Sequence, residues 1–208
     1  MRIIIFANGE LPNPEKARTL IQPTDFIICA DGGTRHALTL GLIPNLIIGD
    51  MDSLPETFDI SAFDGEMRVF PKDKNETDLE LAINHTMTLD PKEIIVVAAL
   101  GGRIDQTLAN ISLLTNFQHA TFDMKLSDGV EEIFLCNDQV VVKGKSGDVI
   151  SLIPWQGNVE GVTTQNLKWK LNHEILFFDK TRGISNEMIS DFAKITITKG
   201  LLLVIHQI

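Results

Sequence analysis

Short runs that are apolar at nearly every residue are the feature that most constrains this fold. A strand with one wet face alternates apolar and polar residues, so runs without alternation indicate strands buried on both faces. Helix-like segments separate these runs along the first 120 residues. This order predicts a parallel sheet with helices on each side. The runs span residues 2–7, 25–30, 46–49 and 93–99, and helices are expected over 14–21, 34–40, 79–89 and 105–117.

The pattern changes after about residue 128, where strand-like runs follow one another with turn residues between them. This texture predicts an all-β second part, a sandwich or flattened barrel. Lys199-Gly200, between two runs, predicts a hairpin. We therefore expect an α/β fold in which a Rossmann-like parallel sheet flanked by helices (1–128) precedes a β domain (129–208). The later runs span 133–136, 140–142, 149–153, 159–164, 175–178, 195–198 and 201–206.

The charge balance excludes some classes of partner. Among 208 residues, 18 Lys and Arg oppose 28 Asp and Glu, a net charge of −10. Binding to the nucleic-acid backbone or to an anionic membrane needs a basic face, so no nucleic-acid or membrane partner is expected. The longest apolar run has seven residues, from 94 to 100, against about 18 for a membrane span.

Compartment is predicted from the N-terminus and the cysteines. The first residues are apolar for only five positions, which predicts a strand and is too short for a signal peptide. Cys29 and Cys136 each lie in an apolar run, which favours buried free thiols over a disulfide. The cytoplasm is the expected compartment.

Acidic, glycine-containing turns follow three of the apolar runs. Ligands bind outside the carboxyl ends of strands in open parallel sheets, so these turns are expected on one rim. Asp50 and Asp52, two residues apart, are expected to project the same way from an extended segment. The segments are Asp31-Gly32-Gly33, Asp50-Met51-Asp52-Ser53 and Gly101-Gly102-Arg103-Ile104-Asp105, with a fourth at 72–78 before the predicted helix.

The electrostatic cost of this cluster predicts its use. Two carboxylates about 4 Å apart repel by about 4 kcal/mol at an effective dielectric of 20, against a total stability of about 5–15 kcal/mol. Protons or cations must therefore neutralise them. Magnesium prefers carboxylate oxygens together with substrate phosphates. Glycines let backbone N–H groups approach phosphate, and Arg103, Lys72 and Lys74 can meet its charge. We predict a metal–phosphate site.

Each segment also has a purely structural interpretation. Asp31-Gly32-Gly33 alone is a common turn, and Asp50-Met51-Asp52-Ser53 could form an Asx turn or a helix N-cap. Thr77-Asp78 could cap the helix that follows. Gly101-Gly102 could form a tight turn, with Asp105 stabilising a helix N-terminus. Four such segments on one predicted rim nevertheless favour the metal–phosphate site.

Other kinds of chemistry find less support. The five histidines form no pair at ligand spacing, which argues against a zinc or haem site. Ser53 has no neighbouring sequence signature of a nucleophile, which argues against acyl transfer. The histidines are His36, His85, His119, His173 and His206.

Six motifs in fixed order over nearly the whole chain resemble those of the thiamine pyrophosphokinases. Position 106 varies in that family, since many bacterial relatives carry His and others carry Gln as here. The motifs are Asp31-Gly32-Gly33, Gly49-Asp50-Met51-Asp52-Ser53, Lys72-Asp73-x-x-x-Thr77-Asp78, Gly101-Gly102-Arg103-x-Asp105-Gln106-x-x-Ala109-Asn110, Asn166-Leu167-Lys168-Trp169 and Gly183-Ile184-Ser185-Asn186-Glu187.

This resemblance implies a function. The family transfers the pyrophosphoryl group of ATP to the hydroxyl of thiamine, giving thiamine diphosphate and AMP. Its members are homodimers of an α/β domain followed by a β domain. Thiamine lies in a cleft between the first domain of one subunit and the second domain of the other. Mg²⁺, ATP as co-substrate, thiamine and a homodimer with its active site at the subunit interface are therefore expected here.

The resemblance also implies residue roles. Asp50, Asp52 and Asp78 match the magnesium ligands and, with Asp73, form the expected catalytic set. Asp73 or Asp78 could act as general base, with little to separate them. Ser185-Asn186 could instead cap a helix, and Trp169 could be a core residue. The expected binding residues are Asp31, Gly32, Lys72, Thr77, Gly102, Arg103, Asp105 and Gln106 on the nucleotide side, and Trp169, Ser185 and Asn186 on the thiamine side.

Two other functions stay open. Pyrophosphoryl transfer to another heterocyclic alcohol, such as a hydroxymethylpterin, would keep the acidic cluster and present Trp169 to a different ring. A nucleotide-binding sensor or structural dimer without catalysis is a different class. Retention of every metal carboxylate argues against that second class.

Overall fold

The computed structural model describes all 208 residues, in two compact units. Unit 1 comprises Met1–Leu113 and Ala120–Gly129, and unit 2 comprises Leu114–His119 and Val130–Ile208. The chain passes from unit 1 to unit 2 after Gly129. The short segment Leu114–His119, which lies earlier in the sequence, also belongs to unit 2. Each unit is described by itself below.

Unit 1 contains six parallel strands in the order β6-β5-β1-β2-β3-β4. The four apolar runs form the middle strands, which are buried at every residue or all but the first. The sequence pattern missed the two outer strands, whose residues are largely polar. The strands are β1 (Arg2–Phe6), β2 (Phe26–Ala30), β3 (Leu46–Gly49), β4 (Glu66–Val69), β5 (Glu93–Val97) and β6 (Asp123–Ser127).

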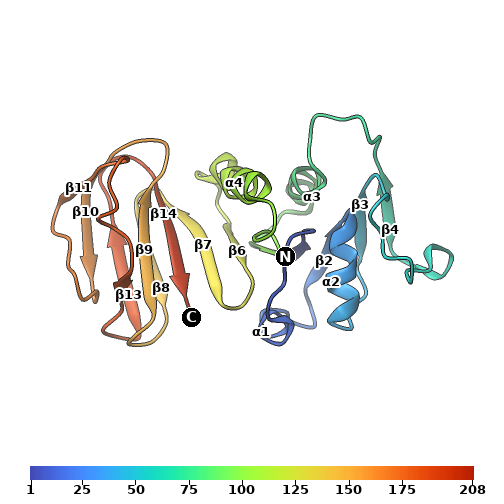
Figure 1. Cartoon of the computed structure of the whole chain (residues 1–208), viewed down its shortest axis with the longest axis horizontal. Coiled ribbons are helices and arrows are strands. Elements are labelled where there is room, and N and C mark those ends of the chain that lie inside the picture. Colours follow the sequence, from blue (N-terminus) through green and yellow to red (C-terminus); the bar gives the residue numbers. More distant parts are fainter. The chain divides into compact units, whose positions relative to one another are not determined.

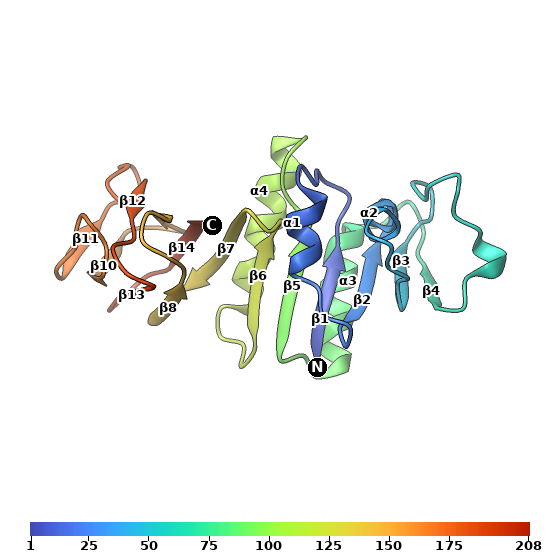
Figure 2. The same ribbon diagram turned by 90° about the horizontal axis from the view of Figure 1, so that it is seen from below.

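Helices cover both faces of this sheet, as predicted. In Figures 1 and 2, α1 and α2 lie on one face and α3 and α4 on the other. Ala17 of α1 and Ala37 of α2 pack on the strand residues Ile4 and Phe6, and small side chains let these helices approach the sheet closely. The helices are α1 (Pro14–Thr19), α2 (Thr34–Thr39), α3 (Asp78–Thr86) and α4 (Ile104–Leu113), with short 3-10 turns η1 (Asp31–Gly33), η2 (Ile60–Ala62) and η3 (Met87–Leu89).

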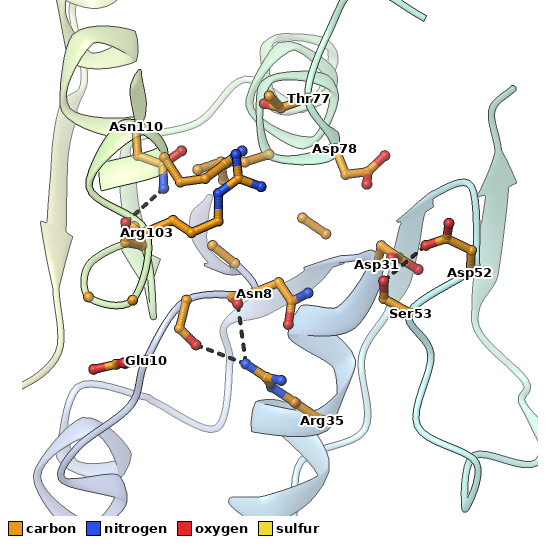
Figure 3. Close-up of a pocket in the computed structure, with 18 of the residues that line it drawn as sticks. Asn8, Glu10, Asp31, Arg35, Asp52, Ser53, Thr77, Asp78, Arg103 and Asn110 are labelled. Atoms are coloured by element: carbon orange, nitrogen blue, oxygen red, sulfur yellow. Dashed lines mark hydrogen bonds between the residues drawn. The ribbon is translucent and has the colours of Figure 1, made fainter. Parts of the chain in front are cut away.

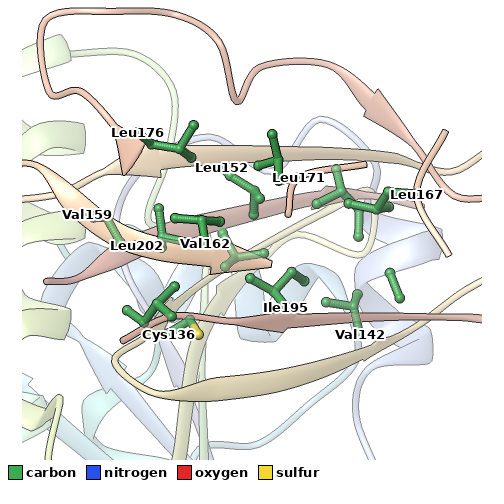
Figure 4. Packing of buried hydrophobic residues seen from close by; sticks show 14 of the residues in the cluster. Cys136, Val142, Leu152, Val159, Val162, Leu167, Leu171, Leu176, Ile195 and Leu202 are labelled. Atoms are coloured by element: carbon green, nitrogen blue, oxygen red, sulfur yellow. The ribbon is translucent and has the colours of Figure 1, made fainter. Parts of the chain in front are cut away.

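Unit 2 is all-β apart from η4 (Leu114–Phe117) and has two antiparallel sheets, in the orders β12-β9-β14-β7 and β11-β10-β13-β8. One apolar core lies between them, with Leu152 and Leu202 from the first sheet against Val162 and Ile195 from the second (Figure 4). The strands are β7 (Glu131–Cys136), β8 (Gln139–Lys143), β9 (Val149–Pro154), β10 (Val159–Gln165), β11 (Glu174–Leu176), β12 (Asn186–Glu187), β13 (Phe192–Thr196) and β14 (Leu202–Gln207).

The hairpin predicted at Lys199-Gly200 is wrong. The two strands that it joins belong to different sheets, since β13 pairs with β8 and β10 whereas β14 pairs with β7 and β9. Lys199 still lies beside β10, because its backbone carbonyl accepts the Glu160 N–H at 2.9 Å. Gly200, at φ 103°, then carries the chain across to the other sheet. A turn at Lys199-Gly200 was correctly predicted, but this turn links two different sheets.

Both cysteines are buried free thiols, as predicted. Burial raises the pKa of Cys136 to about 11 and also raises that of Cys29. None of the helices combines the length and the apolar character that crossing a bilayer requires.

Candidate active site

A pocket of about 600 Å³ opens at the carboxyl ends of β1, β2 and β5 (Figure 3). The chain leaves β1 toward β2, β3 and β4 on one side and returns to β5 on the other side of β1. Strand order therefore reverses at this point, which is where open α/β sheets bind ligands. All four acidic segments contribute to its lining, through residues such as Asp31, Asp52, Thr77 and Arg103.

Three carboxylates converge beside this pocket. Asp31, Asp50 and Asp78 each offer one oxygen, and these oxygens lie within 4.8 Å of one another. Asp31 is only 4% exposed, and its Oδ1 accepts no hydrogen bond, nor does Oδ1 of Asp78. We call these three residues the carboxylate triad. Buried carboxylate oxygens at this spacing that accept no hydrogen bond suit a hard divalent cation.

Local backbone geometry brings the triad together. Asp31 begins η1 directly after β2 with φ 42°, and Asp78 is the first residue of α3, whose N-cap Thr77 accepts the Glu80 N–H at 3.2 Å. Gly49, with φ 156°, ends β3 between them. A Cβ there would lie 2.7 Å from the Asp31 Cβ and 3.2 Å from the Asp78 Cγ. Only glycine lets the third strand pass this close to both carboxylates.

The triad is negative and only partly compensated. Lys74 Nζ lies 3.0 Å from Asp78 Oδ1 and 3.9 Å from Asp50 Oδ2. Burial raises the pKa of Asp31, a Ser53 hydrogen bond lowers it, and the charges of Asp78 and Asp50 raise it again, leaving it above the usual aspartate range. The raised pKa reflects a site that favours protons or cations.

Asp52 lies apart from the triad. Its side chain pairs with Lys72, and it accepts a 2.9 Å hydrogen bond from Ser53 Oγ. The Lys72 hydrogen bond and charge hold its pKa below the usual range. The extended segment expected between Asp50 and Asp52 is interrupted, because Met51 has a left-handed φ of 66°. The Asx turn was correctly predicted, since the Asp52 N–H donates to Asp50 Oδ1 at 3.1 Å, but no helix begins there.

The glycine turn after β5 presents Arg103 to the pocket. Gly101 and Gly102 have φ values of 79° and 67°, which glycine adopts without strain. Asp105 does not line the pocket. It holds the Arg103 guanidinium through contacts of 2.5 and 3.1 Å and accepts the Gln106 N–H at 2.9 Å. Asp105 therefore orients the arginine, and Gln106 lines the pocket beside it.

Two other predicted residues are placed away from the cavity. Asp73 is exposed and does not line the pocket. Gly32 is buried in η1, where a Cβ would lie 2.4 Å from the Asn8 side chain. Thr77 and Lys72 both line the pocket.

Sequence reasoning missed Asn8, Glu10 and Arg35, which line the same pocket. The Arg35 guanidinium donates to the carbonyls of Asn8 (3.2 Å) and Gly9 (3.0 Å), which fixes the loop after β1 (Figure 3). The rule applied to the other strand ends would have found this loop, since Asn8-Gly9-Glu10 follows the first apolar run. Asn110 belongs to one of the six motifs, but the sequence assigned it no role. Its side-chain amide donates to the Ala99 carbonyl at 2.7 Å.

Unit 2 has a pocket of about 440 Å³ of its own, lined by Trp169, Asn186, Arg182 and apolar neighbours. Trp169 is 56% exposed, so the interpretation of this residue as core is wrong. Lys168 Nζ lies 5.0 Å from its ring centre and 2.8 Å from Glu187 Oε2. An accessible indole in a pocket can stack on a flat heterocycle.

Asn186 holds the tryptophan in place. The side-chain Oδ1 of Asn186 accepts the backbone N–H of Trp169 at 3.1 Å, and its Nδ2 donates to the backbone carbonyl of Trp169 at 2.7 Å. Ser185 does not line this pocket. Its N–H donates to Ser151 Oγ at 3.0 Å. The helix N-cap considered for Ser185-Asn186 is wrong, because the segment forms β12 and pairs with β9.

Comparison with known proteins places both units in one family. Residues 17–126 match "Thiamin pyrophosphokinase, catalytic domain", and residues 138–202 match "Thiamin pyrophosphokinase, vitamin B1 binding domain". A thiamine pyrophosphokinase from Bacillus subtilis (strain 168) is 30% identical over 184 residues, 86% of each chain. Thiamine pyrophosphokinase 1 of Oryza sativa subsp. japonica is 26% identical, covering 84% of this chain and 76% of the relative.

Solved structures agree. The crystal structure of thiamine pyrophosphokinase from Bacillus subtilis has a TM-score of 0.90 and 27% identity, covering 100% of this chain and 99% of the other. A catalytic-domain match over more than half of the chain is joined by a second match that lies within unit 2. The chain belongs to the thiamine pyrophosphokinase family.

Proposed function

We propose that this chain transfers the pyrophosphoryl group of ATP to the hydroxyl of thiamine, producing thiamine diphosphate and AMP. The observation that carries the proposal is the carboxylate triad beside a pocket that Arg103 and several glycines also line, in a chain of this family. Acidic ligands for a cation and basic groups for phosphate together suit a nucleotide polyphosphate better than either would alone.

In the proposed reaction, the thiamine hydroxyl oxygen attacks the β-phosphorus of ATP. The bond from that phosphorus to the oxygen bridging the α- and β-phosphates breaks, AMP leaves with the bond's electrons, and the hydroxyl loses its proton. Such transfers depend on in-line positioning and charge neutralisation more than on covalent catalysis. Of the two carboxylates considered as base, Asp73 does not line the pocket, so we do not propose it as the base.

The triad fits magnesium. Asp31, Asp50 and Asp78 supply three oxygens within 4.8 Å of one another, and Oδ1 of Asp31 and Oδ1 of Asp78 accept no hydrogen bond. Bound there, Mg²⁺ would neutralise phosphate charge and orient the polyphosphate. We propose these three carboxylates as its ligands. Asp52, assigned to the metal by resemblance, would reach it only after leaving Lys72, so we place it at the rim of the site.

The remaining pocket residues divide by charge. We propose that Arg103 and Lys72 contact phosphate oxygens, with Asp105 orienting the arginine. Thr77, Gly102 and Gln106 line the same cavity and offer hydrogen-bond donors to the nucleotide. Gly32 acts through packing, because its missing Cβ makes room for the Asn8 side chain. In these terms the parallel sheet of unit 1 is a Rossmann-like nucleotide platform.

For thiamine we propose Trp169 as the stacking surface and Asn186 as the residue that holds it, with Ser185 fixing the adjoining backbone. We also propose, from the family resemblance, a homodimer in which unit 2 of one subunit meets unit 1 of its partner around thiamine. The cytoplasm is proposed as the compartment because both cysteines are reduced and buried.

The decisive experiment measures AMP release by the purified protein with Mg²⁺ and ATP, adding either thiamine or 6-hydroxymethylpterin. Thiamine-dependent AMP and thiamine diphosphate in equal amounts are expected. Release that depends on the pterin alone would favour the other heterocyclic alcohol. Nucleotide binding without release in either case would favour a sensor. Either of these two outcomes would overturn the proposal.

A further inference from the structure

Lys74 is set into the acidic site in an unusual way. Its side chain is only 12% exposed, whereas that of Lys72, two residues earlier, is 80% exposed. The Lys74 ammonium lies 3.0 Å from Asp78 Oδ1 and 3.9 Å from Asp50 Oδ2. It donates one hydrogen bond of 3.2 Å, to the carbonyl of Pro71. A lysine is rarely buried unless its charge is needed where it lies.

The contact with the triad is electrostatic and incomplete. Asp78 Oδ1 accepts no hydrogen bond even though the ammonium is 3.0 Å away. Oδ1 of Asp31 is also left without a partner. Three carboxylates and one ammonium leave two negative charges uncompensated, which equals the charge of one divalent cation. Lys74 thus lowers the repulsion within the triad without satisfying it.

A divalent ion on the triad and the ammonium in its present position would compete for the Asp78 carboxylate. Magnesium binds oxygen ligands at about 2.0–2.1 Å in near-ideal octahedral geometry, and the ammonium already lies 3.0 Å from one oxygen of Asp78. Lys74 also lines the pocket proposed for the polyphosphate. A four-carbon stem lets its charge move by several ångströms without a change of backbone.

We propose that Lys74 is an exchangeable counter-ion: it occupies the Asp50–Asp78 edge of the triad in the ion-free protein and turns to the polyphosphate when the metal–nucleotide complex binds. This inference rests on the proposed function for the identity of the anion. When the metal binds without nucleotide, the Lys74 ammonium must leave the triad and finds no phosphate to pair with. With the nucleotide present, the same movement gains a phosphate contact. Lys74 therefore couples the two ligands, and the coupling is reciprocal.

The test is a calorimetric titration of Mg²⁺ into nucleotide-free Lys74→Gln protein, compared with wild type and with Lys72→Gln. Lys72→Gln removes the same charge from a neighbour whose partner, Asp52, lies outside the triad. We expect Mg²⁺ to bind Lys74→Gln about tenfold more tightly than wild type, within the range of about 5–150-fold usual for coupled sites. Lys72→Gln should stay within about twofold, and Lys74→Arg, which keeps the charge, should resemble wild type.

A second titration uses a nonhydrolysable ATP analogue with saturating Mg²⁺. Here the expected sign reverses, and Lys74→Gln should bind about tenfold more weakly, because the ammonium that would meet the phosphates is gone. Opposite signs for the metal alone and for the metal–nucleotide complex are the signature of exchange. A lysine that only blocks the triad would give tighter binding in both titrations. A lysine that only supports the fold would give weaker binding in both.

Either same-sign result, or a Lys72→Gln effect on Mg²⁺ binding without nucleotide as large as that of Lys74→Gln, would overturn the proposal. If Lys74→Gln is unfolded without metal, refolding driven by Mg²⁺ and followed by circular dichroism gives an upper limit on its dissociation constant, because part of the binding energy drives folding. Recovery at a lower Mg²⁺ concentration than saturates the wild type supports exchange, and no recovery refutes it. Because the Mg²⁺ titration needs no thiamine and no turnover, it stands even if AMP release shows a different substrate.

Discussion

Replacing Asp78 with Asn should separate activity from stability. Asp78 attracts Lys74 at 3.0 Å, worth about 5.5 kcal/mol at an effective dielectric of 20. It also repels the Asp31 and Asp50 carboxylates at no more than 4.8 Å, which costs about 3.5 kcal/mol or more for each pair. The amide removes the attraction and both repulsions together. With the oxygens at the 4.8 Å limit, the two effects largely cancel and leave a net relief of about 1.5 kcal/mol.

The amide also weakens the interaction with the start of α3, where Asp78 is the first residue, by about 0.3–1 kcal/mol. We therefore expect metal-free Asp78→Asn protein to unfold within about 1 kcal/mol of wild type, a shift in Tm of about 2–4 °C at most for a chain of this size. Turnover should nevertheless fall by at least about 10²-fold, the usual cost of losing one electrostatic contact to the reacting charge.

The assay pairs thermal unfolding in metal-free buffer with AMP release at saturating Mg²⁺, ATP and thiamine. Glu80→Gln is the matched control, since it removes the same charge from the same turn of α3 at a residue that does not line the pocket. Near wild-type turnover in Asp78→Asn would remove this residue from the catalytic set. A Tm loss of more than about 10 °C would show that the cancellation of charges is wrong.

Three further predictions concern the tryptophan, the close-approach glycine and the buried histidine. Trp169→Ala should raise the KM for thiamine at least about tenfold and leave that for ATP within about twofold, because the exposed ring serves stacking. Gly49→Ala should cost about 1–3 kcal/mol in urea unfolding, because its Cβ would lie 2.7 Å from the Asp31 Cβ. Burial lowers the pKa of His206, but Glu132 and Asp148 raise it more, so the net pKa is raised. Its stabilising contribution is therefore complete below the unfolded value of about 6.5 and is lost as pH rises through the folded pKa. His206→Gln should destabilise more at about pH 6 than at about pH 8 in urea unfolding.

Each of these has its own control. Equal changes in both KM values for Trp169→Ala, or a Tm loss like that of buried Leu171→Ala, would mean that the ring supports the fold instead. Gly147 has φ 98° and open space around its Cβ position, so Gly147→Ala measures backbone strain without overlap. A loss as large as that for Gly49→Ala would refute the close approach. A pH-independent effect of His206→Gln would refute its protonation between the two carboxylates.

Local pattern was enough for the elements and for the region of the site. Runs without polar alternation can be stable only with both faces covered, so β1, β2, β3 and β5 were predicted in place. Because parallel strands bring their carboxyl ends to one edge, the turns that follow them were expected together, and the pocket lies there. Strands β4 and β6 were not predicted because polar residues interrupt the apolar pattern in both, Glu66 and Arg68 in β4 and Asp123, Lys125 and Ser127 in β6.

Tertiary structure decided which groups meet. Asp50 and Asp52 looked like one pair of metal ligands, yet the three carboxylates that converge are Asp50, Asp78 and Asp31, which come from three different segments, while Asp52 pairs with Lys72. Likewise, Lys199-Gly200 has the composition of a hairpin, but pairing with β8 and β10 on one side and with β7 and β9 on the other makes it a link between sheets. Residue type and spacing determine burial and turn formation, which are local properties. Distances between charges depend on a few backbone angles and on strand order, which only the assembled chain defines.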